Sequence, residues 1–170
     1  TSLLPWLLKD NYDDNNNLKA NVVNNHPDYA ESQYHSNMGN TGSFMIRKGK
    51  WKYIQFGHYL SAYKNYSAQL FDLDNDPSEL SDLSSDNPDV CQNMEDILLS
   101  LYNYEYIDCI AKRNDFKLFE EYFWNKYNQT ELKQHFANVY LGFDDNDWTV
   151  ALNWRNEMIS APECTPDMTK

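Results

Sequence analysis

The sequence predicts an α+β fold, in which a small antiparallel sheet of about four strands packs with the helices that follow it. Residues 43–48 and 51–57 are rich in β-branched and aromatic residues and are joined at Lys48-Gly49-Lys50, as in a hairpin. The sequence Asn87-Pro88-Asp89 is typical of a helix start, and apolar residues recur at helical spacing after it. Strands gathered before helices favour α+β over an alternating fold.

Two more segments complete the expected sheet. Ala30 to His35 is expected to form a short strand, and residues 68–73 a strand that ends in an acidic turn. In that turn, Asp76-Pro77-Ser78-Glu79 offers an N-cap Asp, a Pro at the first helical position and a Glu at N3, so it predicts one short helical turn. Residues 9–27 are dominated by Asp and Asn and are expected to form a surface loop.

Four apolar stripes at helical spacing predict the helices of the second half. Such stripes are usually packing faces, so we assign them to the core. They consist of Met94, Ile97, Leu98 and Leu101; Phe116, Phe119, Phe123 and Tyr127; Leu132, Phe136 and Val139; and Trp148, Leu152 and Trp154.

The charge of the chain argues against nucleic acid as a partner. Its 170 residues include 14 Lys and Arg against 26 Asp and Glu, a formal net charge of −12. Binding to a polyanion draws its energy from basic side chains that displace counterions. A polyanionic substrate would therefore need local positive charge, or positive charge from another part of the protein. No stretch is apolar enough to predict a membrane span, and we interpret the abrupt apolar start at Thr1 as an internal cleavage or boundary point.

Two sequons and three cysteines bear on the cellular compartment. Asn65 and Asn128 begin N-x-S/T triplets and are candidate glycosylation sites in a secretory protein. Cys91 and Cys109 are close enough in sequence for a disulfide that closes a helical hairpin, which would leave Cys164 free or joined to another chain. Buried unpaired thiols are the alternative.

Few motifs point to chemistry within the chain itself. Asp72, Asp74 and Asp76 resemble the opening of a calcium loop, but Pro77 and Leu83 occupy the positions of its glycine and its bidentate Glu, so we predict an ordinary turn. Cys164-Thr165-Pro166 is a near miss of the C-x-P-x-R signature, without the arginine, and we interpret it as a coincidence in the tail. The best candidate is His35, at a strand end before a loop of small residues, where it could donate to an anionic substrate.

An ordered succession of motifs resembles the C-terminal region of type I, formylglycine-dependent sulfatases. The branch it resembles contains arylsulfatase K and the choline-sulfatase-like enzymes. The resemblance is strong from Ser2 to Leu83 and weaker through the helical remainder. Its motifs are, in order, Ser2-Leu3-Leu4-Pro5, Tyr34-His35, Gly42 to Ile54, Gln69 to Leu73, Asp76-Pro77 and Glu79-Leu80.

This resemblance implies that the chain is one part of a larger enzyme. Such sulfatases have an N-terminal α/β domain related to alkaline phosphatase, which carries the formylglycine nucleophile and a calcium ion. A small C-terminal sheet with a packed helix completes their substrate cleft. The implied protein is a secreted or lysosomal hydrolase of sulfate esters, such as sulfated sugars, and this chain is its C-terminal portion or light chain. The heavy chain would be its partner and would hold the metal and the nucleophile.

The resemblance also suggests a division of the chain and a substrate contact. Residues 1–30 would contact the N-terminal domain, residues 31–86 would form the sheet, and residues 87–170 would form a helical extension and tail. Where the branch commonly has Glu-Tyr-His, this chain has Gln33, Tyr34 and His35, so we expect His35 and Gln33 to contact substrate. The loss of the carboxylate at Gln33 puts any salt bridge there in doubt. The alternatives are a sulfatase-like protein without catalysis, with a binding or structural role, and an independent carbohydrate-binding module.

Overall fold

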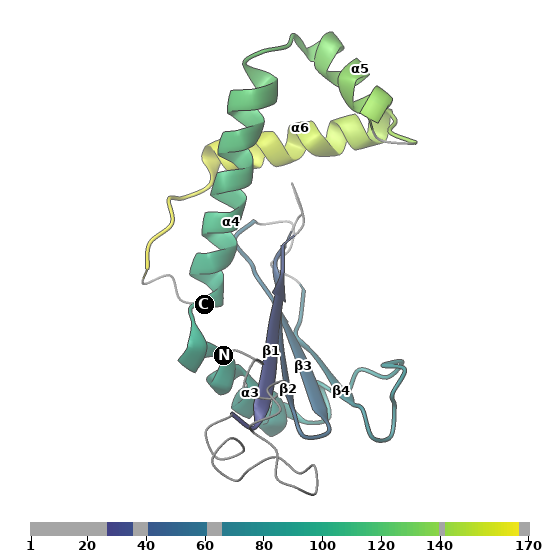
Figure 1. The fold of residues 1–170 in the computed structure, drawn as a ribbon, viewed down its shortest axis with the longest axis vertical. Helices are drawn as coiled ribbons and strands as arrows, with labels where there is room; N and C mark the ends of the chain where they lie inside the picture. Colours follow the sequence, from purple (N-terminus) through teal and green to yellow (C-terminus); the bar gives the residue numbers. More distant parts are fainter. Residues whose placement is uncertain (1–26, 36–40, 61–65, 140–141, 167–170) are drawn as a thin grey trace, which may run out of the picture.

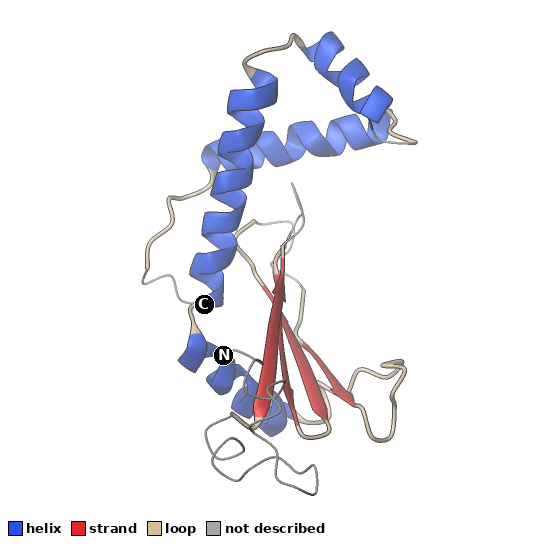
Figure 2. Cartoon of the chain, viewed as in Figure 1, coloured by secondary structure: helices blue, strands red, loops and turns tan. Residues whose placement is uncertain are grey.

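Within residues 27–35, 41–60, 66–139 and 142–166, which a computed structural model describes, the chain forms four strands followed by four α-helices (Figure 1 and Figure 2). The predicted α+β class is confirmed. The apolar start at Thr1, most of the polar segment 9–27 and the sequon residue Asn65 lie outside the described residues.

The four strands form one antiparallel sheet in sequence order. The strands are β1 (Tyr29–Tyr34), β2 (Ser43–Lys48), β3 (Trp51–Phe56) and β4 (Gln69–Asp72). All four predicted strands are present, within a residue or two of the expected bounds. At the β2–β3 hairpin, Gly49 has a φ of 57°, a left-handed conformation that glycine adopts without steric cost. The sequence therefore places a glycine where the hairpin needs one.

One face of the sheet is covered by α3 (Pro88–Leu101), which packs against β2 and β3. The register places Ile46 opposite Tyr53, and Tyr53 opposite Leu70, so their side chains share this face. Met94 and Leu98 of α3 are buried against them. We call the resulting core the sheet cluster. It consists of Phe44, Ile46, Tyr53, Leu70, Met94, Leu98 and Tyr104.

The two predicted helix starts have different outcomes. At α3 the prediction is confirmed, with Pro88 in the first turn, although the Asn87 side chain makes no capping hydrogen bond. At residues 76–79 the predicted helical turn is wrong, and the chain forms turns instead. Glu79 has a φ of 55°, which a right-handed helix cannot accommodate. The Asp76 carboxylate instead accepts hydrogen bonds from the N–H groups of Leu80 and Ser81, both at 2.8 Å.

The remaining helices build a second core beyond the sheet. They are α4 (Tyr104–Phe119), with a π-helical turn η3 (Glu120–Trp124) at its end, α5 (Gln129–Val139) and α6 (Asp145–Ser160). Figure 1 shows α4 running past the end of the sheet, with α5 and α6 on its far half. We call their shared core the helical cluster. It consists of Tyr59, Leu60, Cys109, Phe119, Leu132, Phe136, Trp154 and Met158.

Most stripe residues assigned to the core are buried or half-buried, but three are exposed. Val139 is 59% exposed, Tyr127 40% and Leu101 37%. All three lie at or beyond the end of a helix or helical turn. The periodic pattern thus extends past the part of each helix that has a packing partner.

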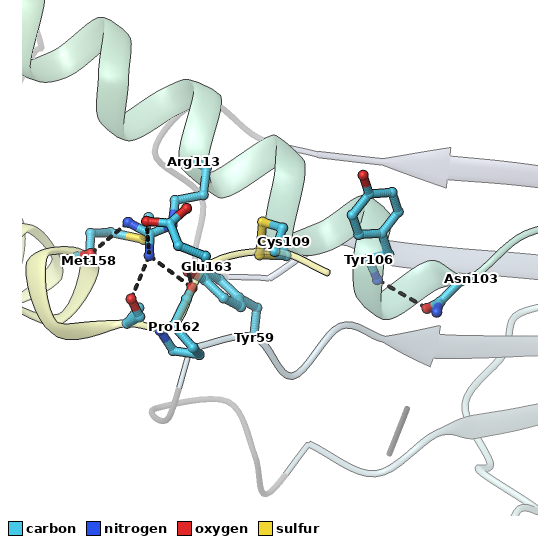
Figure 3. The surroundings of a disulfide bond; sticks show 10 residues. Tyr59, Asn103, Tyr106, Cys109, Arg113, Met158, Pro162 and Glu163 are labelled. Carbon is cyan, nitrogen blue, oxygen red and sulfur yellow. Dashed lines mark hydrogen bonds and ion pairs between the residues drawn. A yellow bond between two sulfur atoms is a disulfide. The ribbon is translucent and has the colours of Figure 1, made fainter. Parts of the chain in front are cut away.

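The expected Cys91–Cys109 disulfide is wrong, because Cys109 is bonded to Cys164 and Cys91 is a free thiol. Cys91 lies on α3 beside the sheet cluster, whereas Cys109 belongs to the helical cluster, so the two sulfur atoms belong to different cores. The tail after α6 returns along α4 and brings Cys164 to Cys109 (Figure 3). Arg113 holds this tail by donating to the carbonyl oxygens of Met158, Ala161 and Pro162.

Candidate functional site

The candidate site lies at the edge of the sheet where β1 ends, β2 begins and β3 ends. His35 directly follows β1, Gly42 directly precedes β2, and Gly57 directly follows β3. The Gly57 N–H donates to the Gly42 carbonyl oxygen at 2.9 Å, which keeps these two backbones together beyond the last strand pair. The fold therefore brings His35 beside a pair of glycines.

The two glycines leave room for a side chain from α4. A Cβ atom on Gly57 would lie 2.3 Å from Cγ of Asp108, and one on Gly42 would lie 2.7 Å from Cε1 of His35 and 2.9 Å from Oδ1 of Asp108. A residue larger than glycine would therefore clash with Asp108 or His35 at both positions. The Gly42 N–H donates to Oδ1 of Asp108 at 2.7 Å, so the carboxylate fastens α4 to the sheet edge.

Lys112 lies one helical turn beyond Asp108 and pairs with it inside the protein. Its Nζ is 3.5 Å from Oδ1 of Asp108, and the two side chains are 0% and 1% exposed. Among the described residues, Nζ of Lys112, Oδ2 of Asp108 and Nδ1 of His35 are buried without a hydrogen-bond partner. Buried polar groups normally have partners, so three unsatisfied atoms close together single out this place; the other two such atoms, Nε of Arg113 and Nε1 of Trp154, lie in the helical region. We call His35, Gly42, Gly57, Asp108 and Lys112 the sheet-edge site.

The environment of His35 favours its neutral ring. Burial lowers its pKa below the ordinary 6.5; the nearby Asp108 carboxylate opposes this shift, and the Lys112 ammonium adds to it. Nε2 of His35 lies 3.3 Å from Oε1 of Gln33, and the ring meets Phe44 edge-on at 5.2 Å between centroids. Because Nδ1 is buried and the contact between Nε2 and Gln33 is exposed, Nε2 is the ring nitrogen that a ligand hydroxyl can approach.

The structure thus brings together the two predicted site residues and adds two that sequence reasoning did not assign to a site. Gln33 and His35 are in contact, with Gln33 exposed and His35 half-buried. Asp108 and Lys112 were not predicted to lie near His35. The available signal was Asp108, a charged residue inside the apolar run Ile107 to Ile110. Charged residues are rarely buried unless they are paired, so a charge among apolar neighbours suggests a special environment.

The other chemical motifs are accounted for structurally. Both oxygens of Asp72 are engaged inside the turn, with Lys50 Nζ and Asn75 Nδ2 bound to Oδ2 and the Asp74 N–H to Oδ1. These hydrogen bonds, from Lys50 first and then Asn75, lower the pKa of Asp72. Among the described residues, no group of three or more His, Cys, Asp or Glu side chains is placed to hold a metal ion. Cys164 is in the disulfide and has no free thiol.

Two further observations concern the surface and the membrane. Asn128 is exposed at the start of α5, where its Oδ1 accepts from the Glu131 N–H at 3.0 Å. The other sequon residue, Asn65, is not among the described residues. In the part of the chain that the structure covers, no helix has the length and apolar character needed to cross a bilayer.

Comparison with known proteins gives a consistent result. No protein-family profile matches the chain. Arylsulfatase K of Danio rerio is 37% identical over 115 residues, which are 68% of this chain and 19% of that protein. Arylsulfatase K of Gallus gallus is 27% identical over 137 residues, 81% of this chain and 22% of that protein. The human arylsulfatase K is 28% identical over 118 residues, 69% of this chain and 20% of that protein.

These matches cover most of the chain but only about a fifth of the length of each relative. Several relatives with the same name agree, and the sheet with its covering helix has the architecture that the motifs implied. The predicted resemblance is confirmed: the chain resembles the C-terminal region of a sulfatase of the arylsulfatase K type.

Proposed function

We propose that the chain is the C-terminal part, or light chain, of an enzyme that hydrolyses sulfate esters of sugars, glycosaminoglycans included. The observation that carries the proposal is the 37% identity to an arylsulfatase K over 68% of the chain. The four-stranded sheet covered by α3 agrees with it.

The proposal assigns the bond-breaking step to the N-terminal part of the protein. That part would supply the formylglycine nucleophile, the calcium ion and most of the positive charge. The described residues of this chain offer no comparable metal site. Residues 1–30 would contact the N-terminal part, residues 31–86 would contribute the sheet, and residues 87–170 would form a helical extension. The enzyme would be glycosylated and would work in the secretory pathway or the lysosome.

Within this chain, we assign the substrate contact to His35 and Gln33. The Nε2 edge of the neutral His35 ring lies at the surface beside the exposed Gln33 amide, so these two groups can hydrogen-bond a sugar hydroxyl. Asp108 balances the Lys112 ammonium beneath the ring, so in this proposal the positive charge for an anionic substrate comes from the N-terminal part. His35 is therefore a binding residue in this proposal and not a catalytic acid.

The test begins with the intact protein that contains this chain. Mass spectrometry of its peptides should show formylglycine in the N-terminal part, and the protein should release sulfate from sulfated sugars. Formylglycine without hydrolysis of any sulfated sugar would contradict the proposed substrate class. An unmodified or replaced nucleophile would contradict the enzymatic function and favour a sulfatase-like protein with a binding or structural role.

The contact by His35 has its own test. His35→Ala should lower kcat/KM for sulfated sugars by about 10-fold, since one hydrogen bond to substrate is lost. His135→Ala is the matched control, because His135 stacks on Tyr127 in the helical region, away from the sheet edge. Equal kcat/KM for His35→Ala and the wild type, across several sulfate esters, would remove His35 from the substrate site.

A further inference from the structure

The ring of His35 is held on three sides at the sheet-edge site. Its Cε1 and Nδ1 atoms lie 2.7 and 2.8 Å from the place that a Cβ atom on Gly42 would take, so the ring packs directly against the Gly42 backbone. Phe44 meets the ring edge-on, and Nε2 faces the Gln33 amide. The two ring nitrogens are thus in different environments, because Nδ1 is buried and Nε2 is at the surface.

The buried nitrogen lies beside a carboxylate and an ammonium group. Nδ1 of His35 and Oδ1 of Asp108 are 2.8 and 2.9 Å from the same point, the place of a Cβ atom on Gly42. Nζ of Lys112 is 3.5 Å from that Oδ1. Within the described chain, Nζ of Lys112, Oδ2 of Asp108 and Nδ1 of His35 are all buried without a hydrogen-bond partner. We therefore expect these atoms to satisfy one another, directly or through a buried water molecule.

The donors and acceptors at this point determine where the neutral ring carries its proton. An ammonium group has only donors, and a carboxylate has only acceptors. Oδ1 of Asp108 already accepts the Gly42 N–H at 2.7 Å. One ammonium group cannot direct all of its hydrogens at one carboxylate, so a Lys112 hydrogen needs another acceptor. A lone pair on Nδ1 of His35 supplies that acceptor, whereas a proton on Nδ1 would add a further donor.

The exposed side of the ring leads to the same tautomer. Nε2 of His35 lies 3.3 Å from Oε1 of Gln33, which is an acceptor, so a proton on Nε2 makes this contact a hydrogen bond. With the proton on Nδ1, two lone pairs would face each other there. Burial is the largest cause of the lowered pKa of His35, so the ring is neutral above pH 6.5. The charges that act on this pKa, Asp108, Lys112 and Asp115, all belong to α4.

We propose that Lys112 and Asp108 are positioning residues that hold the neutral His35 ring with its proton on Nε2, so that His35 donates a hydrogen bond to an oxygen atom of the substrate. The 3.3 Å contact with Gln33 is long for an N–H···O hydrogen bond, so a substrate oxygen can replace it. His35 then selects ligands that place an acceptor at this point, such as a sugar or sulfate oxygen. The inference rests on the proposed function for its substrate, whereas the tautomer is a property of the protein alone.

The tautomer is measured in the intact protein without substrate. With ¹⁵N in the histidine rings, NMR distinguishes protonated from unprotonated ring nitrogens, and the signals that His35→Gln removes belong to His35. Well above pH 6.5, the ordinary histidine pKa, we expect a protonated Nε2 and an unprotonated Nδ1. A protonated Nδ1, or similar amounts of the two tautomers, would overturn the proposal. This measurement needs no change at Lys112 or Asp108, so it decides even where a variant does not fold.

Two variants test whether Lys112 is the cause. Lys112→Met removes the donor and leaves the Asp108 carboxylate beside Nδ1, so most molecules should carry the proton on Nδ1. The kcat/KM for sulfated sugars should then fall about 10-fold, mainly through KM, because His35 no longer donates. Lys117→Met is the matched control, since it removes an ammonium group from an exposed position of the same helix and should change neither quantity.

The possible results separate this inference from the proposed function. A folded Lys112→Met variant that keeps the proton on Nε2, or that moves it without a change in kcat/KM, would overturn the inference. So would a wild-type protein that hydrolyses sulfated sugars with the proton on Nδ1, and in that case the proposed function stands. An inactive protein with the proton on Nε2 would contradict the proposed function and support the assigned tautomer.

Discussion

The sheet cluster and the helical cluster are held together in different ways. In the sheet cluster, three antiparallel strand pairings set the positions of the apolar side chains that α3 covers. In the helical cluster, short helices meet mainly through aromatic contacts, such as the stacking of Phe119 on Phe136, and through the disulfide between Cys109 and Cys164. The first core is supported by local hydrogen bonding, whereas the second depends on a tail that comes back from the end of the chain.

Helix α4 belongs to both cores and is the link between them. Tyr104 in its first turn is part of the sheet cluster, and Cys109 and Phe119 are part of the helical cluster. Between them, Asp108 and Lys112 sit at the sheet edge. The sheet-edge site therefore lies where the two cores are joined, so changes there should lower the stability of both cores.

The largest effect should come from Asp108→Ala. This change leaves the buried Lys112 ammonium without its carboxylate and the Gly42 N–H without its acceptor, and we expect a loss of about 3–5 kcal/mol in the free energy of unfolding. Urea denaturation measures it. The control is Lys133→Ala, which breaks a pair with the 92%-exposed Asp145 and should cost less than about 1 kcal/mol. Similar costs for the two variants would mean that Asp108 does not join the cores.

The next largest effect should come from the disulfide. Cys109 and Cys164 are 55 residues apart, and the loss of a cross-link over such a loop typically costs about 2–4 kcal/mol. We expect Cys164→Ser to lower the protection of α5 and α6 amides in hydrogen exchange much more than that of β2 and β3. Cys91→Ser, which alters a thiol outside any disulfide, serves as the control. Equal loss of protection in strands and helices would show that the two cores unfold as one unit.

The sequence predicted the sheet better than the helical region, and the two cores explain why. The hairpin glycine and the runs of β-branched and aromatic residues lie within a few residues of the contacts that they predict, as with Gly49 between β2 and β3. The disulfide pairing depends instead on where the tail runs after α6. That path is determined by Arg113 and Tyr59, which bind the tail from distant parts of the chain. A local sequence pattern therefore cannot predict this path.

The candidate site was predictable only in part for the same reason. His35 and Gln33 stand out because a strand ends there, and that is a local feature. Asp108 and Lys112 reach them only because α4 crosses the edge of the sheet and both glycines leave room for it. The helical turn predicted at residues 76–79 is absent because Glu79 adopts a left-handed φ, which the local sequence does not predict.

A smaller effect is expected from changes at Asn128, which has two roles: it caps α5, and it is the proposed glycosylation site. Asn128 and Glu131 form a reciprocal cap at α5, with each side chain bound to the other's N–H at 3.0 Å. Asn128→Ala should therefore cost about 1 kcal/mol. Asn128→Asp keeps the capping oxygen and should cost little, although both changes abolish the sequon.

Intact mass measurement of protein from a secreting host then tests the glycan separately. We expect both variants to lose the mass of one glycan and only the alanine variant to lose stability. Wild-type protein that carries no glycan at Asn128 would contradict the proposed modification, while equal stability of the two variants would contradict the cap.

The smallest effect should be a pH dependence at the sheet edge. Because the pKa of His35 is lowered in the folded protein, the unfolded chain binds the proton more readily. The stabilisation is complete above the unfolded value of about 6.5, and it is lost as the pH falls through the lower, folded pKa. Burial is the largest cause, and Asp108, Lys112 and Asp115 are the charges that act on the ring.

His35→Gln should remove this contribution and flatten the dependence of Tm on pH below neutrality. The ring is partly exposed and solvent screens it, so we expect a change of less than about 1 kcal/mol. Lys112→Met is a second test. It removes the ammonium that lowers the pKa of His35 and leaves Asp108, which raises it. The destabilisation by acid that we attribute to His35 should therefore be weaker in this variant. The same pH profile of Tm in the wild type and in His35→Gln would contradict a lowered pKa of His35 in the folded protein.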